Sequence, residues 1–378
     1  MRIAALGDAH LGRSYYPVTA GSGVNQRERD FEVSFEAAVA LALSLEPDLV
    51  LWLGDIFDHP RPSYRSYQVA QRALASIRDH GVKAVVISGN HDTPRLPGKG
   101  SPYAALADTF PEMAFAHRMC YERFDFPGLA VHAVPQTLTV KAAVDALDEA
   151  ARGRVADRTN LLLTHPRLRQ LQPRHADINE IEVDQDLLRC DLVLLGHYHT
   201  FTTVTETMWY AGAPDSFSFA DEPERSKGIV LLDTDTGHCQ AVELTGRRPL
   251  VTLESVYALG LAPSELQDLL EKRAAAIPEG AVARVYVDGV DPDVWRLVDR
   301  NAVRDAARLG LHLKVEPQFV SRSIPAELPE IAGLGAQWTR YLAGQDLTGL
   351  DSGSVRQLGL DYLDAAILGG PGPAPSSC

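Results

Sequence analysis

The chain has 378 residues, of which 45% are hydrophobic and 23% charged, and its formal net charge at pH 7 is -14. This composition is typical of a globular protein with two or three domains and excludes a disordered or fibrous chain. No apolar run approaches the roughly 20 residues of a membrane-spanning helix, and the N-terminus lacks a signal-peptide pattern, so we expect a cytoplasmic protein with no membrane contact. The four cysteines are widely scattered with no CxxC, which argues against disulfides and a thiolate zinc site.

Five short apolar segments, each bounded by turn residues, predict buried strands at 3–6, 49–53, 84–87, 161–163 and 192–195. Two amphipathic helical patterns lie between the first three. One begins at Asp30, which we expect to be its N-cap, and the other runs from Tyr67 to Ile77. This alternation indicates an α/β fold, and 209–218 and 228–233 are expected to add β structure to it.

A turn-rich stretch at 244–249 suggests a domain boundary. After it we expect a smaller α/β module and then two terminal helices. The expected elements are a helix opened by Pro263, a strand at 283–287, a helix from about 292 to 309, a strand at 311–315, and helices around 337–343 and 354–368. The last residues, "GGPGPAPSSC", are expected to be disordered.

Each of the five predicted strands is followed by side chains that can bind a metal ion. The seven candidates are Asp8, His10, Asp55, Asn90, His165, His197 and His199. Because sites in α/β sheets form beyond the carboxyl ends of the strands, we expect these side chains to converge. Each motif taken singly could be a turn or a cap, but five together favour a site.

Seven nitrogen and oxygen donors exceed the needs of one tetrahedral ion and suit two ions that share a carboxylate. Without thiolates, they favour manganese, iron or zinc. Two such ions roughly 3.5 to 4 Å apart activate water and clamp a phosphoryl group, which is the chemistry of phosphoester hydrolysis. His91, next to Asn90, is the candidate general acid for the leaving oxygen.

In this order, "DAH", "GDIFD", "GNHD", a lone histidine after a strand and "GHYH" resemble the motifs of the calcineurin-like metallophosphoesterases. The resemblance implies a four-layer α/β/β/α sandwich. It also implies that Asp8, His10 and His199 hold one metal, that Asn90, His165 and His197 hold the second, and that Asp55 bridges the two. His91 would protonate the leaving oxygen and Asp58 would orient His91. His165 is assigned from its strand context alone.

Within that superfamily, "DAHLGR", "GDIFDHPRPS", "GNHDTP" and "WYAGAPDSFSFADEPERSKGIVLLD" resemble the SbcD-type family of DNA double-strand-break repair nucleases over residues 1–235. This implies a nuclease domain at 1–248, a capping, DNA-binding domain at 249–322, and at 323–378 a linker, candidate ATPase-docking helices and a disordered tail. One departure is Ala213, which stands where the family has a small hydroxyl residue.

The implied activity is a two-metal DNA phosphodiesterase, with Mn²⁺ as the expected ion and Fe or Zn as alternatives. It would act as an exonuclease on duplex ends and as an endonuclease on single strands or hairpins, in DNA repair and recombination. The implied partners are DNA, an SbcC-like SMC-family ATPase and a second copy of the chain, at the nucleoid in the cytoplasm.

Two other functions stay open. The chain could be a phosphatase or a hydrolase of small phosphodiesters or cyclic nucleotides, although such an enzyme has less reason to carry the module after 250. It could also be a non-catalytic scaffold protein, but the intact ligand set disfavours that.

Two further features have both a bland and a functional interpretation. A helical stripe could pack on its own domain or dock the ATPase; it comprises Val355, Leu358, Tyr362 and Ala366. Basic clusters could be solvated surface or could contact phosphates; they comprise Arg61, Arg65 and Arg72, then Arg167, Arg169, Arg174 and His175, then Arg247 and Arg248.

Overall fold

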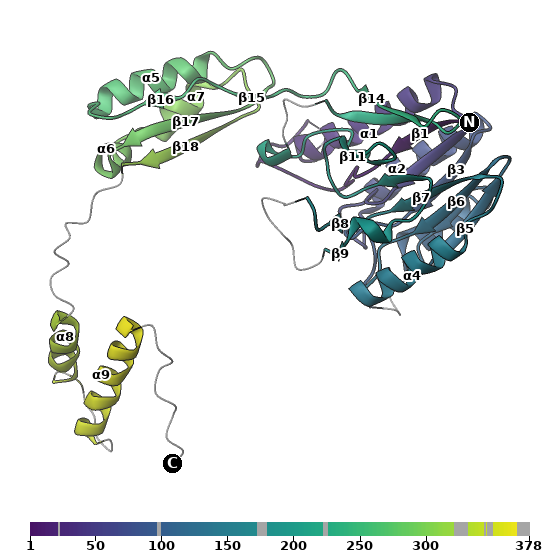
Figure 1. The fold of residues 1–378 in the computed structure, drawn as a ribbon. Coiled ribbons are helices and arrows are strands. Elements are labelled where there is room, and N and C mark those ends of the chain that lie inside the picture. Colours follow the sequence, from purple (N-terminus) through teal and green to yellow (C-terminus); the bar gives the residue numbers. More distant parts are fainter. Residues whose placement is uncertain are drawn as a thin grey trace. The chain divides into compact units, whose positions relative to one another are not determined.

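The computed structural model describes residues 1–21, 23–96, 100–171, 180–221, 226–320, 332–343, 345 and 351–368. The chain divides into two compact units, Met1–Gln318 and Phe319–Cys378, which are described separately (Figure 1). Among the described residues no helix is long and apolar enough to cross a membrane.

The first sheet of the larger unit has the strand order β14-β13-β1-β2-β3-β4. Its strands are β1 (Arg2–Leu6), β2 (Leu49–Leu53), β3 (Lys83–Ile87), β4 (Ala114–Ala116), β13 (Gly228–Asp233) and β14 (His238–Glu243). The four strands β1 to β4 are parallel, and β13 pairs antiparallel with β1. Because β1, β2 and β3 are parallel, the loops that follow them all leave from the same edge of the sheet.

The second sheet has the strand order β11-β12-β10-β7-β6-β5. Its strands are β5 (Glu122–Phe126), β6 (Leu129–Val134), β7 (Thr159–Thr164), β10 (Leu192–Leu195), β11 (Thr202–Thr205) and β12 (Met208–Tyr210). Here β6, β7, β10 and β12 run parallel. The small elements β8 (Arg167–Leu168), β9 (Glu182–Val183), η2 (Gln185–Leu187) and η3 (Phe219–Asp221) lie in the connections.

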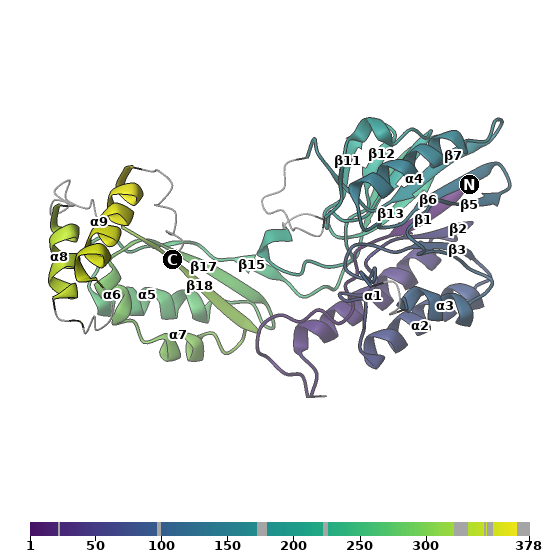
Figure 2. The same ribbon diagram turned by 90° about the horizontal axis from the view of Figure 1, so that it is seen from below.

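The two sheets pack face to face, and helices cover both outer faces (Figure 2). Alternation along β1 shows why: Ile3 and Ala5 belong to the core between the sheets, whereas Ala4 and Leu6 belong to the core beneath the helices. The helices α1 (Gln26–Ser44), α2 (Tyr64–Asp79) and α3 (Pro102–Thr109) cover the first sheet, and α4 (Val140–Arg152) covers the second. The expected four-layer α/β/β/α sandwich is therefore confirmed.

The prediction that α1 begins with Asp30 as its N-cap is wrong. The helix begins at Gln26, and the side chain of Asn25 caps it by accepting from the backbone N–H groups of Arg27 and Glu28. Asp30 lies inside the first turns and accepts hydrogen bonds from Arg248, so its carboxylate serves a tertiary contact rather than the helix end.

Residues 250–319 form a smaller sheet with its own apolar core. The strands are β15 (Leu250–Thr252), β16 (Val256–Tyr257), β17 (Val282–Val290) and β18 (His312–Phe319), and α5 spans Pro263–Ala275. The single helix expected from 292 to 309 is wrong. It divides into α6 (Pro292–Arg296) and α7 (Arg300–Ala306), because the Asp299 side chain caps a new helix by accepting from the N–H groups of Asn301 and Ala302.

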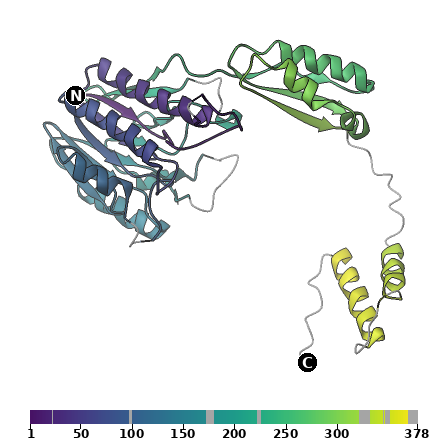
Figure 3. The ribbon, with the colours of Figure 1, turned by 180° about the vertical axis from the view of Figure 1, so that it is seen from behind.

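In the second unit, α8 (Ala332–Leu342) and α9 (Ser352–Leu368) pack side by side (Figure 3). The indole N–H of Trp338 donates to the carbonyl oxygen of Arg356 at 3.1 Å. Leu358 and Tyr362 of the expected stripe are 48% and 46% exposed, so docking of a partner there stays a prediction. The tail expected to be disordered, 369–378, lies outside the described residues.

Candidate metal centre

The seven candidate ligands lie at the carboxyl ends of strands from both sheets. Loops after β1, β2 and β3 of the first sheet carry Asp8, His10, Asp55 and Asn90, and loops after β7 and β10 of the second sheet carry His165, His197 and His199. The structure brings all seven together, including His165, for which the sequence offered only its strand context.

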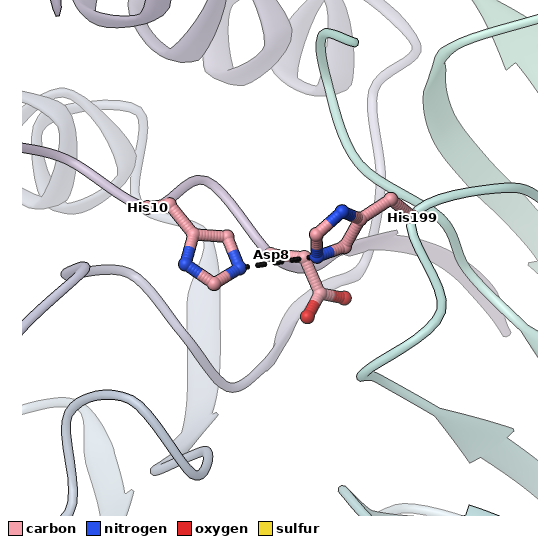
Figure 4. A group of neighbouring side chains, drawn as sticks. All are labelled: Asp8, His10 and His199. Atoms are coloured by element: carbon pink, nitrogen blue, oxygen red, sulfur yellow. Dashed lines mark hydrogen bonds between the residues drawn. The ribbon is translucent and has the colours of Figure 1, made fainter. Parts of the chain in front are cut away.

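One group of donors consists of Asp8, His10 and His199, whose ligand atoms lie within 4.8 Å of one another (Figure 4). The Nε2 atoms of His10 and His199 face each other at 3.2 Å. His10 is fully buried, so few other partners can reach its Nε2. Two ring nitrogens and a carboxylate aimed at one point are the donor chemistry of a divalent cation site.

A second group consists of Asp8, Asp55 and His165. Nε2 of His165 lies 3.2 Å from Oδ2 of Asp55 and 3.7 Å from Oδ1 of Asp8. The side-chain oxygen of Asn90 lies 3.1 Å from the same Nε2 and 3.2 Å from Nδ1 of His197. These donors could hold a second cation.

Asp55 lies between the two groups. Its Oδ1 accepts from the backbone N–H of His91 at 2.9 Å, which fixes the carboxylate. Its Oδ2 lies 3.2 Å from Nε2 of His165 and 3.7 Å from Nε2 of His10. One carboxylate oxygen is thus within reach of both groups, as a shared ligand must be.

Partners behind the histidines fix which ring nitrogen faces the centre. Nδ1 of His165 donates to the carbonyl oxygen of Leu53 at 2.6 Å, because a carbonyl can only accept. Nδ1 of His10 donates to Oδ1 of Asp58 at 3.1 Å. In both rings the proton on Nδ1 leaves the Nε2 lone pair directed at the centre, which is how metal-binding histidines are usually oriented.

Glycines in the motifs allow His165 to approach β2. A Cβ at Gly196 would lie 2.0 Å from the carbonyl oxygen of Leu53 and 2.4 Å from Nδ1 of His165. A Cβ at Gly54, whose φ is +98°, would lie 2.5 Å from the same Nδ1. The glycines of "GD" and "GH" are therefore needed for the hydrogen bond that orients this histidine.

Four of the candidate ligands have positive φ, a conformation that costs side-chain-bearing residues free energy. The values are 51° for Asp8, 47° for His10, 50° for Asp55 and 96° for His197. Such strain is concentrated at functional sites, and here it turns the side chains from the strand ends toward one point.

Electrostatics divides the histidines into two kinds. Burial lowers the pKa of His10 and of His197 to about 3, so both imidazoles are neutral. Burial opposes protonation of His165 too, but the carboxylates of Asp55 and Asp8 outweigh it and raise the pKa of His165 to about 10. Buried carboxylates thus attract positive charge to the centre, which a proton or a metal cation can supply.

His91 lies beside the donors and is more open to solvent. Its side chain is 34% exposed, and its Nδ1 lies 3.2 Å from the carbonyl oxygen of Asp58 and 3.4 Å from Oδ1 of the same residue. Burial lowers the pKa of His91, but the hydrogen bond and charge of Asp58 and the charge of Asp55 raise it to about 9. With Nδ1 engaged, a protonated Nε2 remains available to donate.

Three residues that contribute to the centre were not identified from the sequence. The ring of Phe217 lies 5.0 Å from that of His10 and 4.9 Å from that of His199. Arg13 places a guanidinium nitrogen 3.5 Å from Oδ1 of Asp58. The buried amine of Lys227 donates to the carbonyl oxygen of His199 at 2.5 Å. Phe217 and Lys227 fall in the "WYAGAPDSFSFADEPERSKG" segment, whose spacing alone does not indicate these contacts.

Most of the basic residues suggested for phosphate contacts are engaged in ion pairs. Arg65 contacts Glu32 at 2.6 Å and Arg72 contacts Glu36 at 2.7 Å. The same holds for further members of the clusters: Arg167 and Arg169 pair with Glu182, Arg247 with Glu243, and Arg248 with Asp30. Arg61 has no such partner among the described residues, and Arg174 and His175 lie outside them.

Comparisons with known proteins agree with this geometry. The chain is similar to the DNA double-strand break repair protein Mre11 of Methanocaldococcus jannaschii (32% identity, 29% of this chain, 28% of that protein) and of Saccharolobus solfataricus (25%, 62% and 60%). It is also similar to SbcD, the smaller-named half of the SbcCD nuclease of Escherichia coli K12 (23% identity, 96% of this chain, 94% of that protein). The chain thus spans less than two thirds of the first two relatives.

A dimetal phosphatase structure from Danio rerio matches with a TM-score of 0.36 at 12% identity, covering 61% of this chain and 91% of that one, which is too low to carry an argument. The family model of the calcineurin-like phosphoesterases matches residues 1–201, which is more than half of the chain and includes all seven candidate ligands. The chain therefore belongs to the calcineurin-like phosphoesterase family.

Proposed function

We propose that this chain is a two-metal DNA phosphodiesterase, an exonuclease on duplex ends and an endonuclease on single strands or hairpins, acting in repair and recombination. The observation that carries the proposal is the convergence of seven nitrogen and oxygen donors with a partly exposed histidine beside them. DNA as the substrate is supported by the names of the relatives, above all the SbcD protein that aligns with 96% of this chain.

The donors divide between two cations in this proposal. Asp8, His10 and His199 hold the first, and Asn90, His165 and His197 hold the second, with Asp55 shared. The family implies divalent metals, and the donor set, rich in imidazole and carboxylate and free of thiolate, suits Mn²⁺ best, with Fe or Zn as alternatives. Bound there, the cations supply Lewis acidity and an activated water at neutral pH.

The chain's own residues complete the chemistry. His91 donates the proton of its Nε2 to the leaving oxygen, while Asp58 holds the other ring nitrogen. The water oxygen bonds to phosphorus, the bond to the leaving oxygen breaks, and solvent restores the proton to His91. Asp58 also holds His10, so it positions an acid and a ligand at once.

Partners and location belong to the same proposal. We infer an SbcC-like SMC-family ATPase as the partner and a homodimer as the working form, in the cytoplasm at the nucleoid. The region after residue 250 favours this over a small-phosphodiester hydrolase, which needs no additional module.

The test is manganese-dependent cleavage of end-labelled linear duplex and single-stranded DNA, beside bis-p-nitrophenyl phosphate as a generic ester. His91→Ala is expected to lower kcat on DNA by about 10²- to 10⁴-fold while the bound manganese, measured by elemental analysis, stays the same. Cleavage of the small ester alone, even with the matching ATPase added, would favour the small-substrate hydrolase. Loss of manganese from the variant would make His91 a ligand, since His10, Asp55 and His91 also form a possible metal group.

A further inference from the structure

A cavity of about 470 Å³ opens beside His91 and outside the ligand cluster. Two loops line it, residues 58–61 after β2 and residues 90–96 after β3, and Gly100 completes it. Its size lies within the roughly 300 to 1,000 Å³ typical of ligand pockets. The cavity shares His91 and Asn90 with the candidate centre, so a substrate bound at the metals can extend into it.

The walls combine apolar surface with positive charge. Pro60, Pro94 and Leu96 supply apolar surface, and Leu96 is 62% exposed. Arg61 and Arg95 also line the cavity, and both are exposed. Proline and leucine surface suits the flat face of a base or a sugar, whereas arginine suits a phosphate.

These two arginines differ from most others on this acidic chain. Neither has a carboxylate oxygen within 4.0 Å among the described residues, whereas the nearby Arg65 and Arg72 are held by Glu32 and Glu36. A guanidinium that is not neutralised keeps its charge and its forked donors for an external anion. Two of them on one cavity make a local positive site despite the net charge of -14.

The position of His91 assigns the cavity to one side of the substrate. A general acid must contact the oxygen that leaves, so the leaving part of the substrate lies on the His91 side of the phosphorus. A second cavity, of about 270 Å³, also borders Asn90 and Arg95, but it lacks His91 and has Glu180 in its wall, whose carboxylate would repel a phosphate. The first cavity therefore fits the leaving side better.

We propose that the cavity between the 58–61 and 90–96 loops is the subsite for the leaving nucleotide, with Arg61 and Arg95 binding the next phosphate of the strand. This deepens the proposed function and rests on it. The subsite ties a cut to the presence of at least one further nucleotide on the leaving side, and a substrate that lacks that nucleotide loses the contribution of both arginines.

The experiment compares two substrates in the full chain with manganese. Trithymidylate carries a leaving nucleotide with a following phosphate, whereas the p-nitrophenyl ester of thymidine 5′-phosphate releases nitrophenolate, which has neither. For Arg61→Gln and for Arg95→Gln, the ratio of kcat/KM on trithymidylate to kcat/KM on the ester is expected to fall at least fivefold. Arg118→Gln, at an exposed arginine just after β4, removes the same charge outside the cavity and is the matched control.

Equal losses on both substrates, or a ratio that stays within twofold of the unsubstituted chain, would overturn the subsite. If the unsubstituted chain hydrolyses the ester but not trithymidylate, the DNA function fails independently. The subsite is then judged by thymidine 3′,5′-bisphosphate as an inhibitor of ester hydrolysis. Inhibition that Arg61→Gln weakens at least fivefold, and Arg118→Gln does not, supports it, and inhibition that does not depend on Arg61 overturns it.

Discussion

The carboxylate of Asp58 accepts a hydrogen bond from His10, with Oδ1 of Asp58 3.1 Å from Nδ1 of His10. The same Oδ1 lies 3.4 Å from Nδ1 of His91. The second aspartate of "GDIFD" thus contacts a candidate ligand as well as the candidate acid that the resemblance assigned to it. Its loss should affect metal binding and proton transfer together.

Asp58→Asn is expected to weaken manganese binding about 10- to 100-fold, since the amide no longer fixes the His10 ring through a charge-assisted hydrogen bond. Titration calorimetry of the metal-free protein with Mn²⁺ measures this. Asp79→Asn, at an exposed aspartate at the end of α2, is the control and should leave affinity as it was. Unaltered manganese affinity in Asp58→Asn, with activity alone reduced, would limit Asp58 to His91.

Gly196→Ala should displace His165, because its Cβ would lie 2.0 Å from the carbonyl oxygen of Leu53. We expect a loss of about 1–3 kcal/mol in the free energy of unfolding from overpacking, together with weaker metal binding. Thermal unfolding and bound manganese are the measurements. Gly21→Ala, where a Cβ meets nothing within 4 Å, is the control. A variant as stable and as metal-loaded as that control would show that β2 and the His197 loop can separate.

Removal of the metals is expected to lower the Tm. The candidate ligands come from both sheets, so a cation that binds them links the two sheets in the folded state only. At a metal concentration 100 times Kd this linkage is worth about 2.7 kcal/mol per site. Differential scanning calorimetry with EDTA and with excess Mn²⁺ measures the shift, and His10→Ala should show a smaller one. Identical Tm values in both buffers would contradict the proposed centre.

Asp30 provides a test of stability against pH. Burial raises its pKa, but hydrogen bonds from Arg248 and Gln26 outweigh this and hold the pKa below the ordinary 3.8. Because the folded pKa is below the unfolded one, the stabilisation is complete above about pH 4 and is lost as pH falls through the folded pKa. Asp30→Asn should therefore lower the Tm at pH 7 but much less at pH 2.5. A Tm difference that stays constant over this range would exclude the charge as its cause.

The sequence allowed much of the fold to be predicted because the five buried strands are short apolar runs with turns at both ends. Strands at the edges were missed: β5 alternates between intermediate and exposed residues and has no apolar run to mark it. Helix ends were less certain, since Asn25 and Asp30 are both good N-caps and only the tertiary contact of Asp30 with Arg248 separates them.

For the candidate centre, residue types and order indicated the donors, but not which atoms face one another. The contact of Asp58 with His10, and the carbonyl of Leu53 behind His165, depend on how two sheets pack, which no local pattern encodes. The ion pairs of Arg65 and Arg72 likewise depend on α1 lying beside α2, so a basic cluster in sequence was not a basic surface in space.

The left-handed backbone at Asp8, His10, Asp55 and His197 has a consequence for engineering the protein. Strain of roughly 1–3 kcal/mol at each such position is relieved by glycine, which adopts positive φ freely. Selection for heat resistance alone would then favour chains that have exchanged these side chains for glycine and lost their chemistry. A thermostable, active variant has to be sought with these four positions held constant.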